Sequence, residues 1–443
     1  MSKKIPPEKL ATKLPEILVQ IEANSLPPPF HVIDVPGATK TVARGINSRR
    51  IVVGTYWTDS AFKQRHGFRY NPSSGVYDTF DVPAKFVARE TVNKGSTGAA
   101  GINDKGYIVG DFATDKGDYG YRLRPWPTSE QYELGANQPS VHRLNIVDLR
   151  YADDDLIERV GGPSNAASIG THATCINNDL YIGGRIFAPR PFGDSAEVHG
   201  FVLTGGDPGR AWVNYRRIDA RHGWNLTEIY GINSYRGDIN FVQRDLLADV
   251  VGVTSESVSG TKAGAFIRYN ATADVPPFPQ PDPTVLFEPQ DQLPVTFSRA
   301  RGINSGREVV GQYTTSTDEK IAVQARPGRG FIRDFNQQNA PSIPIDVPVA
   351  ADWHSFWFGP TKPAKSTYAH GINDDGYVVG EFAEVLADGT ERTHGFIRHP
   401  VLWYLWLLAL GITRRETEEV RNFPEPRPIP VPRWFWEKRS RRS

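Results

Sequence analysis

The sequence is poor in the residues that build covalent cross-links, sulfur-rich metal sites and membrane spans. Its 443 residues include one cysteine, Cys175, so it can form no intrachain disulfide and no multi-cysteine metal site. No apolar run reaches the roughly 18 residues of a membrane span. Basic and acidic side chains nearly cancel, 51 against 50, so no net charge favours binding to nucleic acid. The first 30 residues lack the apolar stretch of a secretory signal, and we therefore expect a cytoplasmic protein.

The sequence also lacks the short motifs that mark common catalytic and metal sites. It contains no Gly-x-Ser-x-Gly nucleophile elbow, no phosphate-binding P-loop and no His-x-x-x-His pair. The acidic turn at 373–376 lacks the full spacing and the distal glutamate of a calcium loop. We therefore expect no catalytic residue, no metal ion and no cofactor, and hence a protein that is not an enzyme.

One short motif, Gly-Ile-Asn, is abundant instead. A turn and a β-branched strand follow each copy, as in Asn103-Asp104-Lys105-Gly106 leading into Tyr107-Ile108-Val109-Gly110. This pattern predicts a β-hairpin, because Asn can bond its own backbone and Gly accepts a positive φ. The copies begin at Gly45, Gly101, Gly231, Gly302 and Gly371, with a sixth at Cys175-Ile176-Asn177.

Two further elements follow each hairpin in a fixed order. The first resembles His-Gly-Phe, as at His66, His199 and His394. The second is a short strand that often ends in Asp-Val-Pro, as at 81–83 and 346–348. Four short strands per repeat, with turns between them, are typical of propeller blades.

The predicted fold is an all-β, six-bladed β-propeller over residues 30–400. The sixth repeat has no Asp-Val-Pro strand of its own, whereas an extra one, His31–Pro36, precedes the first Gly-Ile-Asn. We therefore predict that the N-terminal strand completes the last blade and closes the ring, which removes an exposed sheet edge. An open row of hairpins or a pair of sandwiches is the alternative.

The ordered motifs Gly-Ile-Asn-x-x-Gly-x-Val-Val-Gly, His-Gly-Phe and Ile-Asp-Val-Pro resemble the HAF-type repeat family of bacterial proteins. The resemblance covers about residues 30–400. It implies a bacterial β-repeat protein and no particular reaction. Members of that family are often exported, and the expected lack of a signal peptide departs from that pattern.

Helical extensions and an arm are expected outside the propeller. Apolar residues at helical spacing predict a helix within residues 1–29, followed by a proline-rich linker. Residues 401–423 predict an apolar and then charged helix, which packs on the propeller, on another subunit or at a membrane interface. Residues 424–443 predict a proline-rich basic arm that binds a partner or membrane, or folds back on the propeller. The expected partner or membrane contacts are Trp403, Trp406, Trp434, Phe435, Trp436, Arg439, Arg441 and Arg442.

A weaker candidate site lies in the predicted central channel. The first strand of each blade lines a propeller channel, so the residue immediately before each motif should lie near it. These residues are Arg44, Ala100, Thr174, Tyr230, Arg301 and His370. Arg44, Arg301 and His370 together could hold an anion or an acidic group of a partner; salt bridges to neighbouring blades are the alternative.

The sequence thus favours a non-enzymatic interaction protein, a propeller platform docked into a larger assembly or homo-oligomer through its C-terminal helix and arm. The first alternative is a propeller that binds carbohydrate or another small ligand, with Trp57, Trp126 or Trp224 stacking on sugars. The second is a hydrolase in the channel, which requires two carboxylates or a metal ion on the axis.

Overall fold

Every secondary-structure element of the computed structural model is a β-strand within the residues that the structure describes. The chain divides into a compact part of residues 1–400 and a second of residues 401–443, and all described residues belong to the first. The all-β prediction is therefore confirmed for this part. The structure describes residues 30–82, 93, 95–115, 117–123, 146–148, 170–189, 196–204, 214–220, 224–234, 248–256, 263–271, 284–289, 291, 294–315, 328–337, 340–349, 362–386 and 388–400.

Each Gly-Ile-Asn motif ends the first strand of a four-stranded antiparallel repeat, and we number the repeats 1 to 6 in chain order. In repeats 1 to 3 the four strands pair in sequence order. Their bounds are β2 (Lys40–Ile46), β3 (Val52–Trp57), β4 (Arg65–Asn71) and β5 (Val76–Phe80); β6 (Gly98–Ile102), β7 (Ile108–Ala113), β8 (Asp118–Leu123) and β9 (Ile146–Asp148); β10 (Gly170–Ile176), β11 (Ile182–Pro189), β12 (Ala196–Thr204) and β13 (Asn214–Ile218).

Repeats 4 and 5 follow the same order, and repeat 6 takes its fourth strand from elsewhere in the chain. A two-stranded hairpin, β22 (Pro348–Val349) with β23 (Lys362–Pro363), precedes repeat 6. The remaining bounds are β14 (Leu226–Ile232), β15 (Val250–Ser255), β16 (Ala263–Arg268) and β17 (Thr284–Phe287); β18 (Val295–Ile303), β19 (Glu308–Thr315), β20 (Gly328–Asp334) and β21 (Ile343–Ile345); β24 (Ser366–Ile372), β25 (Val378–Val385) and β26 (Glu391–Arg398).

The fourth strand of repeat 6 comes from the N-terminal side of the described residues. Strand β1 (Phe30–Ile33) pairs antiparallel with β26, with Phe30 opposite Arg398 and Ile33 opposite Gly395. A parallel bridge between Lys40 and Thr393 then joins β2 to β26, so repeats 6 and 1 share one sheet. The pairing of β1 with the last repeat is the one expected from the displaced Asp-Val-Pro strand.

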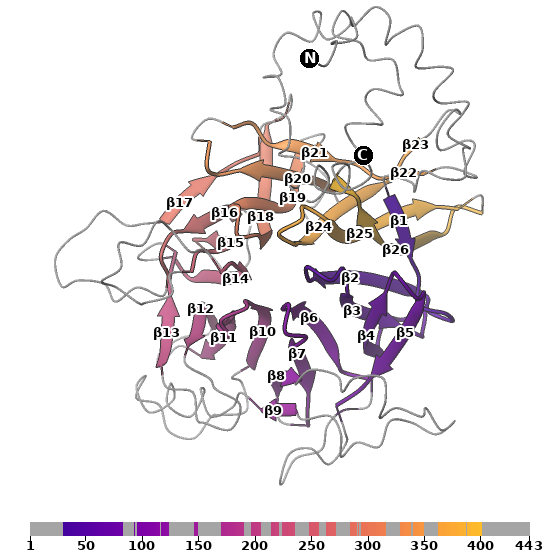
Figure 1. The fold of residues 1–443 in the computed structure, drawn as a ribbon, viewed down its shortest axis with the longest axis horizontal. Coiled ribbons are helices and arrows are strands. Elements are labelled where there is room, and N and C mark those ends of the chain that lie inside the picture. Colours follow the sequence, from indigo (N-terminus) through magenta and orange to yellow (C-terminus); the bar gives the residue numbers. More distant parts are fainter. Residues whose placement is uncertain are drawn as a thin grey trace, which may run out of the picture. The chain divides into compact units, whose positions relative to one another are not determined.

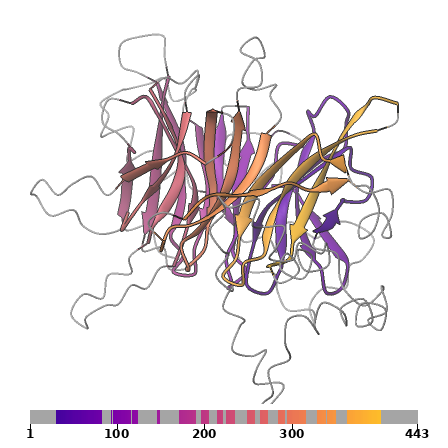
Figure 2. The same ribbon diagram turned by 90° about the horizontal axis from the view of Figure 1, so that it is seen from above.

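The innermost strands of the repeats face a common centre (Figure 1). Each of β2, β6, β10, β14, β18 and β24 contacts the innermost strand of the next repeat, and β24 contacts β2. In the view turned by 90°, the strands of neighbouring repeats run beside one another (Figure 2). The Gly-Ile-Asn motifs therefore come together although they are far apart in the sequence.

The hydrophobic core lies between neighbouring repeats. The ring of Phe68 on β4 is fully buried and lies against Gly54 on β3, where a Cβ would be 2.0 Å from the carbonyl oxygen of Val42 and 2.7 Å from the ring. The glycine that ends the Val-Val-Gly pattern is thus required by packing. Because successive strand residues point to opposite faces, Val52 packs in the core toward repeat 6 and Val53 in the core toward repeat 2.

The asparagines of the motif form a cycle of hydrogen bonds. Each side-chain Nδ2 donates to the backbone oxygen of the asparagine in the next repeat, over 2.9 to 3.4 Å. The last bond, from Asn373 to Asn47, joins residues 326 positions apart. Each Oδ1 accepts a backbone N–H within its own repeat, from a residue at or just before the start of the next strand; Asn103, for instance, accepts from Tyr107 at 2.9 Å. Aspartate could not replace this residue, because it lacks the amide donor.

The histidines of the His-Gly-Phe element hold the outer strands. His66 Nδ1 lies 2.8 Å from an oxygen of Asp81, and His199 makes the equivalent contact with Asp219. In repeat 6, His394 Nδ1 lies 2.8 Å from Asp34, which follows β1. The three histidines therefore have the packing role that their recurrence suggests.

The predicted ends lie outside the described residues. These are the helix and linker of residues 1–29, the helix of 401–423 and the arm of 424–443, together with the aromatic and basic contacts assigned to them. Their roles stay predictions. No helix in the described ranges is long and apolar enough to span a membrane.

Candidate functional site

A β-bulge in every innermost strand turns one side chain toward the centre of the repeats. Pairing of β2 with β3 passes from Ala43 directly to Gly45, so Arg44 is the extra residue. The same shift occurs in the other repeats immediately before the glycine or cysteine of the motif. Bulges re-aim side chains in this way. The re-aimed residues are Arg44, Ala100, Thr174, Tyr230, Arg301 and His370.

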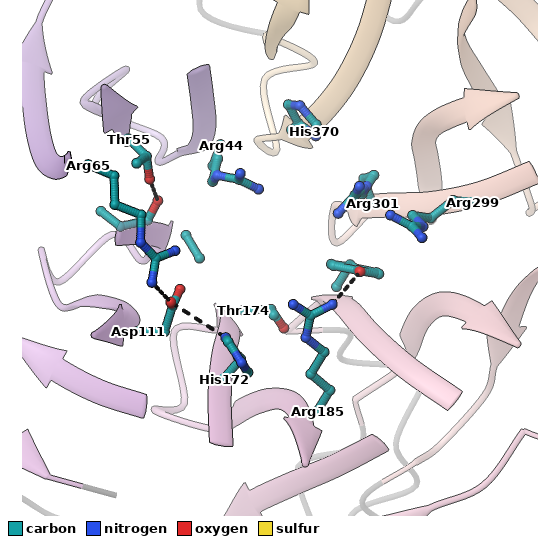
Figure 3. A pocket seen from close by; sticks show the side chains of 13 residues that line it. Arg44, Thr55, Arg65, Asp111, His172, Thr174, Arg185, Arg299, Arg301 and His370 are labelled. Carbon is teal, nitrogen blue, oxygen red and sulfur yellow. Dashed lines mark hydrogen bonds and ion pairs between the residues drawn. The ribbon is translucent and has the colours of Figure 1, made fainter. Parts of the chain in front are cut away.

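All six bulge residues line one cavity of about 240 Å³, which we call the central cavity (Figure 3). Its wall is mostly polar and includes five arginines. Three residues come from the strand positions just beyond the second-strand glycine: Thr55, Asp111 and Arg185. Two more, His172 and Arg299, lie two positions before a bulge residue.

Three of the five arginines are paired with carboxylates of neighbouring repeats. Arg65 forms an ion pair with Asp111, and Arg185 forms one with Glu228. Arg299 lies 3.8 Å from the other oxygen of Glu228. Salt bridges between neighbouring repeats thus occur at these three arginines, whereas the sequence offered them as the alternative for Arg44, Arg301 and His370.

The other two arginines, Arg44 and Arg301, have no carboxylate within ion-pair distance in the described part of the chain. Burial lowers the pKa of Arg44, and burial together with the charge of Arg299 lowers the pKa of Arg301 to about 9. Arg301 lies 4.1 Å from the ring centroid of Tyr230, and its Nε has no hydrogen-bond partner. The protein thus holds two desolvated cations that are not neutralised by its own acids.

His370, the third predicted residue, is held by a carboxylate of its own repeat. Its Nε2 lies 3.2 Å from Glu381, while its Nδ1 has no partner. Burial lowers the pKa of His370 to about 4, with Arg301 and Arg44 acting in the same direction. His370, Lys40 and Arg44 hold the pKa of Glu381 at about 2 despite burial. At neutral pH the pair is a neutral imidazole beside a carboxylate.

Tyr230 belongs to a hydrogen-bonded group that the sequence did not reveal. Its hydroxyl donates to Glu228 Oε2 at 2.7 Å and accepts from Arg185 Nη1 at 3.1 Å. The Glu228 side chain is 6% exposed. Despite its burial, Arg185, Arg299 and the Tyr230 hydroxyl lower the pKa of Glu228, so it stays ionised at neutral pH.

His172 belongs to a second group on the wall formed by repeats 2 and 3. Its Nδ1 lies 3.5 Å from Asp111 and its Nε2 lies 3.6 Å from Asp118. Arg65 and His172 hold the pKa of Asp111 well below its usual range, against the effect of burial. Figure 3 shows Asp111 between Arg65 and His172, away from Arg44 and Arg301.

Within the described residues, no group of three His, Cys, Asp or Glu side chains could hold a metal ion. Burial raises the pKa of the Cys175 thiol to about 12, so this cysteine is a poor nucleophile at neutral pH. Trp57 and Trp224 are partly buried and do not line the central cavity, and Trp126 lies outside the described residues.

The structure brings together the predicted trio Arg44, Arg301 and His370 at the central cavity. Sequence reasoning missed the residues of the next layers, among them Asp111, His172 and Glu228. A usable signal was present, because the two strand positions that they occupy carry polar or charged residues in at least half of the repeats. The position after the second-strand glycine is Thr55, Asp111, Arg185, Gln312 or Glu381 in five repeats, and the position two before the bulge residue is His172, Glu228 or Arg299 in three.

No protein-family model matches the chain, and no curated protein matches it in sequence. The resemblance to HAF-type repeats therefore stays a prediction. Similar solved structures include a subtype N11 neuraminidase-like protein of A/flat-faced bat/Peru/033/2010 (H18N11), at 8% identity and a TM-score of 0.35 over 83% of this chain and 93% of that one. Trypanosoma rangeli sialidase in complex with the inhibitor DANA has 8% identity and a TM-score of 0.37, over 90% and 59%. Polysaccharide lyase Uly1 has 11% identity and a TM-score of 0.36, over 82% and 90%.

The prediction that the protein is not an enzyme is wrong by these comparisons, because a sialidase and a polysaccharide lyase are enzymes. The prediction relied on the absence of short catalytic motifs. Such motifs cannot reveal the polar groups of the central cavity, because these groups come from separate repeats. At these TM-scores the comparisons assign no activity to this chain.

Proposed function

We propose that residues 30–400 form a closed six-bladed β-propeller whose central cavity binds a small acidic sugar. Two cycles support the ring: the Asn-to-Asn hydrogen bonds return from Asn373 to Asn47, and the contacts between innermost strands return from β24 to β2. The pairing of β1 with β26 supports closure by the N-terminal strand.

The observation that carries the binding proposal is the pair Arg44 and Arg301. Both guanidinium groups face the central cavity, and neither has a carboxylate partner among the described residues. Buried cations are normally paired, because an uncompensated charge is costly to desolvate. An anionic group of a ligand would supply the missing charge, and a guanidinium can hold a carboxylate through two parallel hydrogen bonds.

The remainder of the wall suits hydroxyl groups rather than a second anion. Asp111 accepts hydrogen bonds, and Thr55 and Thr174 both donate and accept them. The charge of Asp111 is balanced by Arg65. A cavity of about 240 Å³ is slightly below the usual range of about 300–1,000 Å³ for ligand pockets. It suits a single acidic monosaccharide unit: one carboxylate at Arg44 and Arg301, with hydroxyls toward the paired groups.

Calorimetric titration with glucuronic acid and N-acetylneuraminic acid tests the proposal, with glucose and inorganic sulfate as comparisons. We expect at least one acidic sugar to bind, and glucose and sulfate to bind at least about 10-fold more weakly. Arg44→Gln and Arg301→Gln should each weaken binding by about 10- to 150-fold, since a hydrogen bond to a charged group contributes about 1.5–3 kcal/mol.

Arg392→Gln is the matched control, because Arg392 is 47% exposed and its nearest carboxylate is Asp34 at 3.9 Å. It should leave the affinity unchanged. Binding of glucose as tight as that of the acid sugars would contradict the proposal, as would full affinity in Arg301→Gln. Sulfate binding as tightly as either sugar would reduce the site to a simple anion site.

A further inference from the structure

His370 comes from the strand that lies between the strands of the two unneutralised arginines. Its strand, β24, contacts β18, which carries Arg301, and also β2, which carries Arg44. The backbones approach closely, since a Cβ on Gly371 would lie 2.6 Å from the backbone oxygen of Arg44. Figure 3 shows Arg44, His370 and Arg301 along one side of the central cavity. An anion held by both arginines therefore lies beside His370.

The contacts of His370 leave one ring nitrogen without a partner. Its Nε2 lies 3.2 Å from Oε1 of Glu381. An ionised carboxylate only accepts hydrogen bonds, so the proton of the neutral ring is on Nε2. Its Nδ1 has no hydrogen-bond partner, although the side chain is only 5% exposed. Buried polar atoms normally have a partner, so this nitrogen requires an explanation.

We propose that His370 takes up a proton when the central cavity binds its ligand, and so becomes a third cation beside Arg44 and Arg301. This inference rests on the proposed binding of an acidic sugar. The proton comes from the solvent and binds to Nδ1. The protonated ring then has a donor at each nitrogen: Nε2 keeps its hydrogen bond to Glu381, and Nδ1 donates to the carboxylate of the sugar. The cavity therefore binds acidic sugars more tightly in acidic surroundings and releases them toward neutral pH.

In the free protein the surroundings of His370 oppose its protonation. Burial is the largest cause of its low pKa of about 4, and the charges of Arg301 and Arg44 act in the same direction, against the effect of Glu381. The carboxylate of a bound sugar offsets the charges of the two arginines and raises the pKa of His370. Between the two pKa values, binding therefore consumes a proton, and the affinity rises as the pH falls.

The other titratable groups around the cavity are separable from this effect. Despite burial, His370, Lys40 and Arg44 hold the pKa of Glu381 at about 2, so it keeps its charge between pH 5 and 7. The pKa of Asp111 is also held well below its usual range, against burial.

His172 is the other histidine that lines the cavity, and it lies 3.5 Å from Asp111. It comes from β10, in repeat 3, and Figure 3 shows it away from Arg44 and Arg301. It can take up a proton as well, so it requires a variant of its own.

Calorimetric titration of the full chain with N-acetylneuraminic acid and with glucuronic acid, at pH 7 and at pH 5, tests the proposal. Both sugars are carboxylates at either pH. Each titration is repeated in two buffers of different ionisation enthalpy, because the difference in heat gives the number of protons taken up. We expect uptake of about 0.5–1 proton per ligand at pH 5, and an affinity about 10- to 20-fold higher than at pH 7, as for a histidine whose pKa returns to its ordinary value on binding.

His370→Gln should still bind the sugar at pH 7, but it should lose the proton uptake and the gain in affinity at pH 5, because an amide does not titrate in this range. His31→Gln is the matched control. His31 is exposed, its Nε2 lies 3.1 Å from the hydroxyl of Tyr70, and it does not line the central cavity. This variant should bind as the wild type does at each pH, and near-ultraviolet circular dichroism checks the folding of all variants.

Three outcomes separate the inference from the proposed function. Equal affinity of the wild type at the two pH values, or binding at pH 5 without proton uptake, would overturn the inference and leave the proposed function standing. Loss of the proton uptake in His172→Gln, with its retention in His370→Gln, would also overturn the inference, because the proton would then belong to the other histidine. Absence of binding by both sugars at both pH values would overturn the proposed function as well.

Discussion

At the scale of single residues, Cys175 stands where the other repeats carry glycine, and a second exception faces it across the hairpin. Its partner on β11 is Gly183, whereas Gly45, Gly101, Gly231, Gly302 and Gly371 each face a valine. A Cβ on Gly183 would lie 2.7 Å from the Cys175 sulfur. In this repeat the side chain thus lies on the first strand and the glycine on the second, the reverse of the other repeats.

We expect Gly183→Val and Cys175→Gly each to destabilise the protein, the first by about 1–3 kcal/mol through overpacking against the sulfur. The double variant restores the glycine–valine pair of the other repeats and should recover most of the loss. The coupling energy in a double-mutant cycle should therefore be about 1–3 kcal/mol. Urea denaturation of the four proteins measures it, and additive effects would contradict this explanation of the paired exceptions.

The same scale shows what the sequence could reveal about the site. Arg44, Arg301 and His370 could be predicted to share a channel because they precede a repeated motif. That they are bulge residues could not, because a bulge is a property of pairing between two strands. Arg185 and Glu228 were missed because each lies in a different repeat and their contact spans 43 residues of sequence.

At the scale of elements, β1 differs from the other outer strands because it comes from the opposite end of the described residues. Its attachment to β26 uses the backbone ladder and the contact of His394 with Asp34. The equivalent contact in repeat 1, between His66 and Asp81, joins strands of one repeat. The order of the motifs in the sequence was sufficient to predict that β1 pairs with β26, since only the last repeat lacked its fourth strand.

We expect Asp34→Ala to loosen β1, because His394 Nδ1 loses its carboxylate partner and no hairpin loop joins the strand to β26. Amide exchange in β26 should accelerate, with a loss of about 1–3 kcal/mol in global stability. Asp81→Ala removes the same interaction from repeat 1 and should leave β26 unchanged. Equal rates of amide exchange in β26 for the two variants would show that the contact of Asp34 with His394 does not hold β1 on β26.

At the scale of the whole molecule, the repeat favours a symmetric scaffold and the central cavity departs from that symmetry. The six asparagines share one role, since each donates from Nδ2 to the backbone oxygen of the asparagine in the next repeat. The six bulge residues are not, since they range from Ala100 to Arg301. Position in the repeat therefore fixed where a site would lie, whereas its chemistry depends on which side chains several repeats bring together.

Arg44 and Arg301 should stabilise the ligand complex and destabilise the free protein. At neutral pH Arg301 stays protonated, because its lowered pKa of about 9 is still above 7. A bound anion would relieve the cost of the two unneutralised cations. We expect Arg301→Gln to raise the stability of the free protein by about 0.5–2 kcal/mol. At one concentration an acidic sugar should raise the melting temperature of the wild type more than that of the variant, since the stabilisation grows with the ratio of ligand concentration to Kd.

The pH dependence of stability provides an independent measure of how the charge of Arg301 acts in the central cavity. His370 has a pKa of about 4 in the folded protein, below the ordinary value of 6.5, and Arg301 contributes to that lowering. Between pH 6.5 and 4 the unfolded chain therefore binds more protons at this residue, and folded-state stability falls as the pH falls. In Arg301→Gln the folded-state pKa of His370 should rise and this loss should shrink. Calorimetric melting of both proteins across that pH range checks the effect. If stability falls equally with pH in the two proteins, the charge of Arg301 does not lower the pKa of His370.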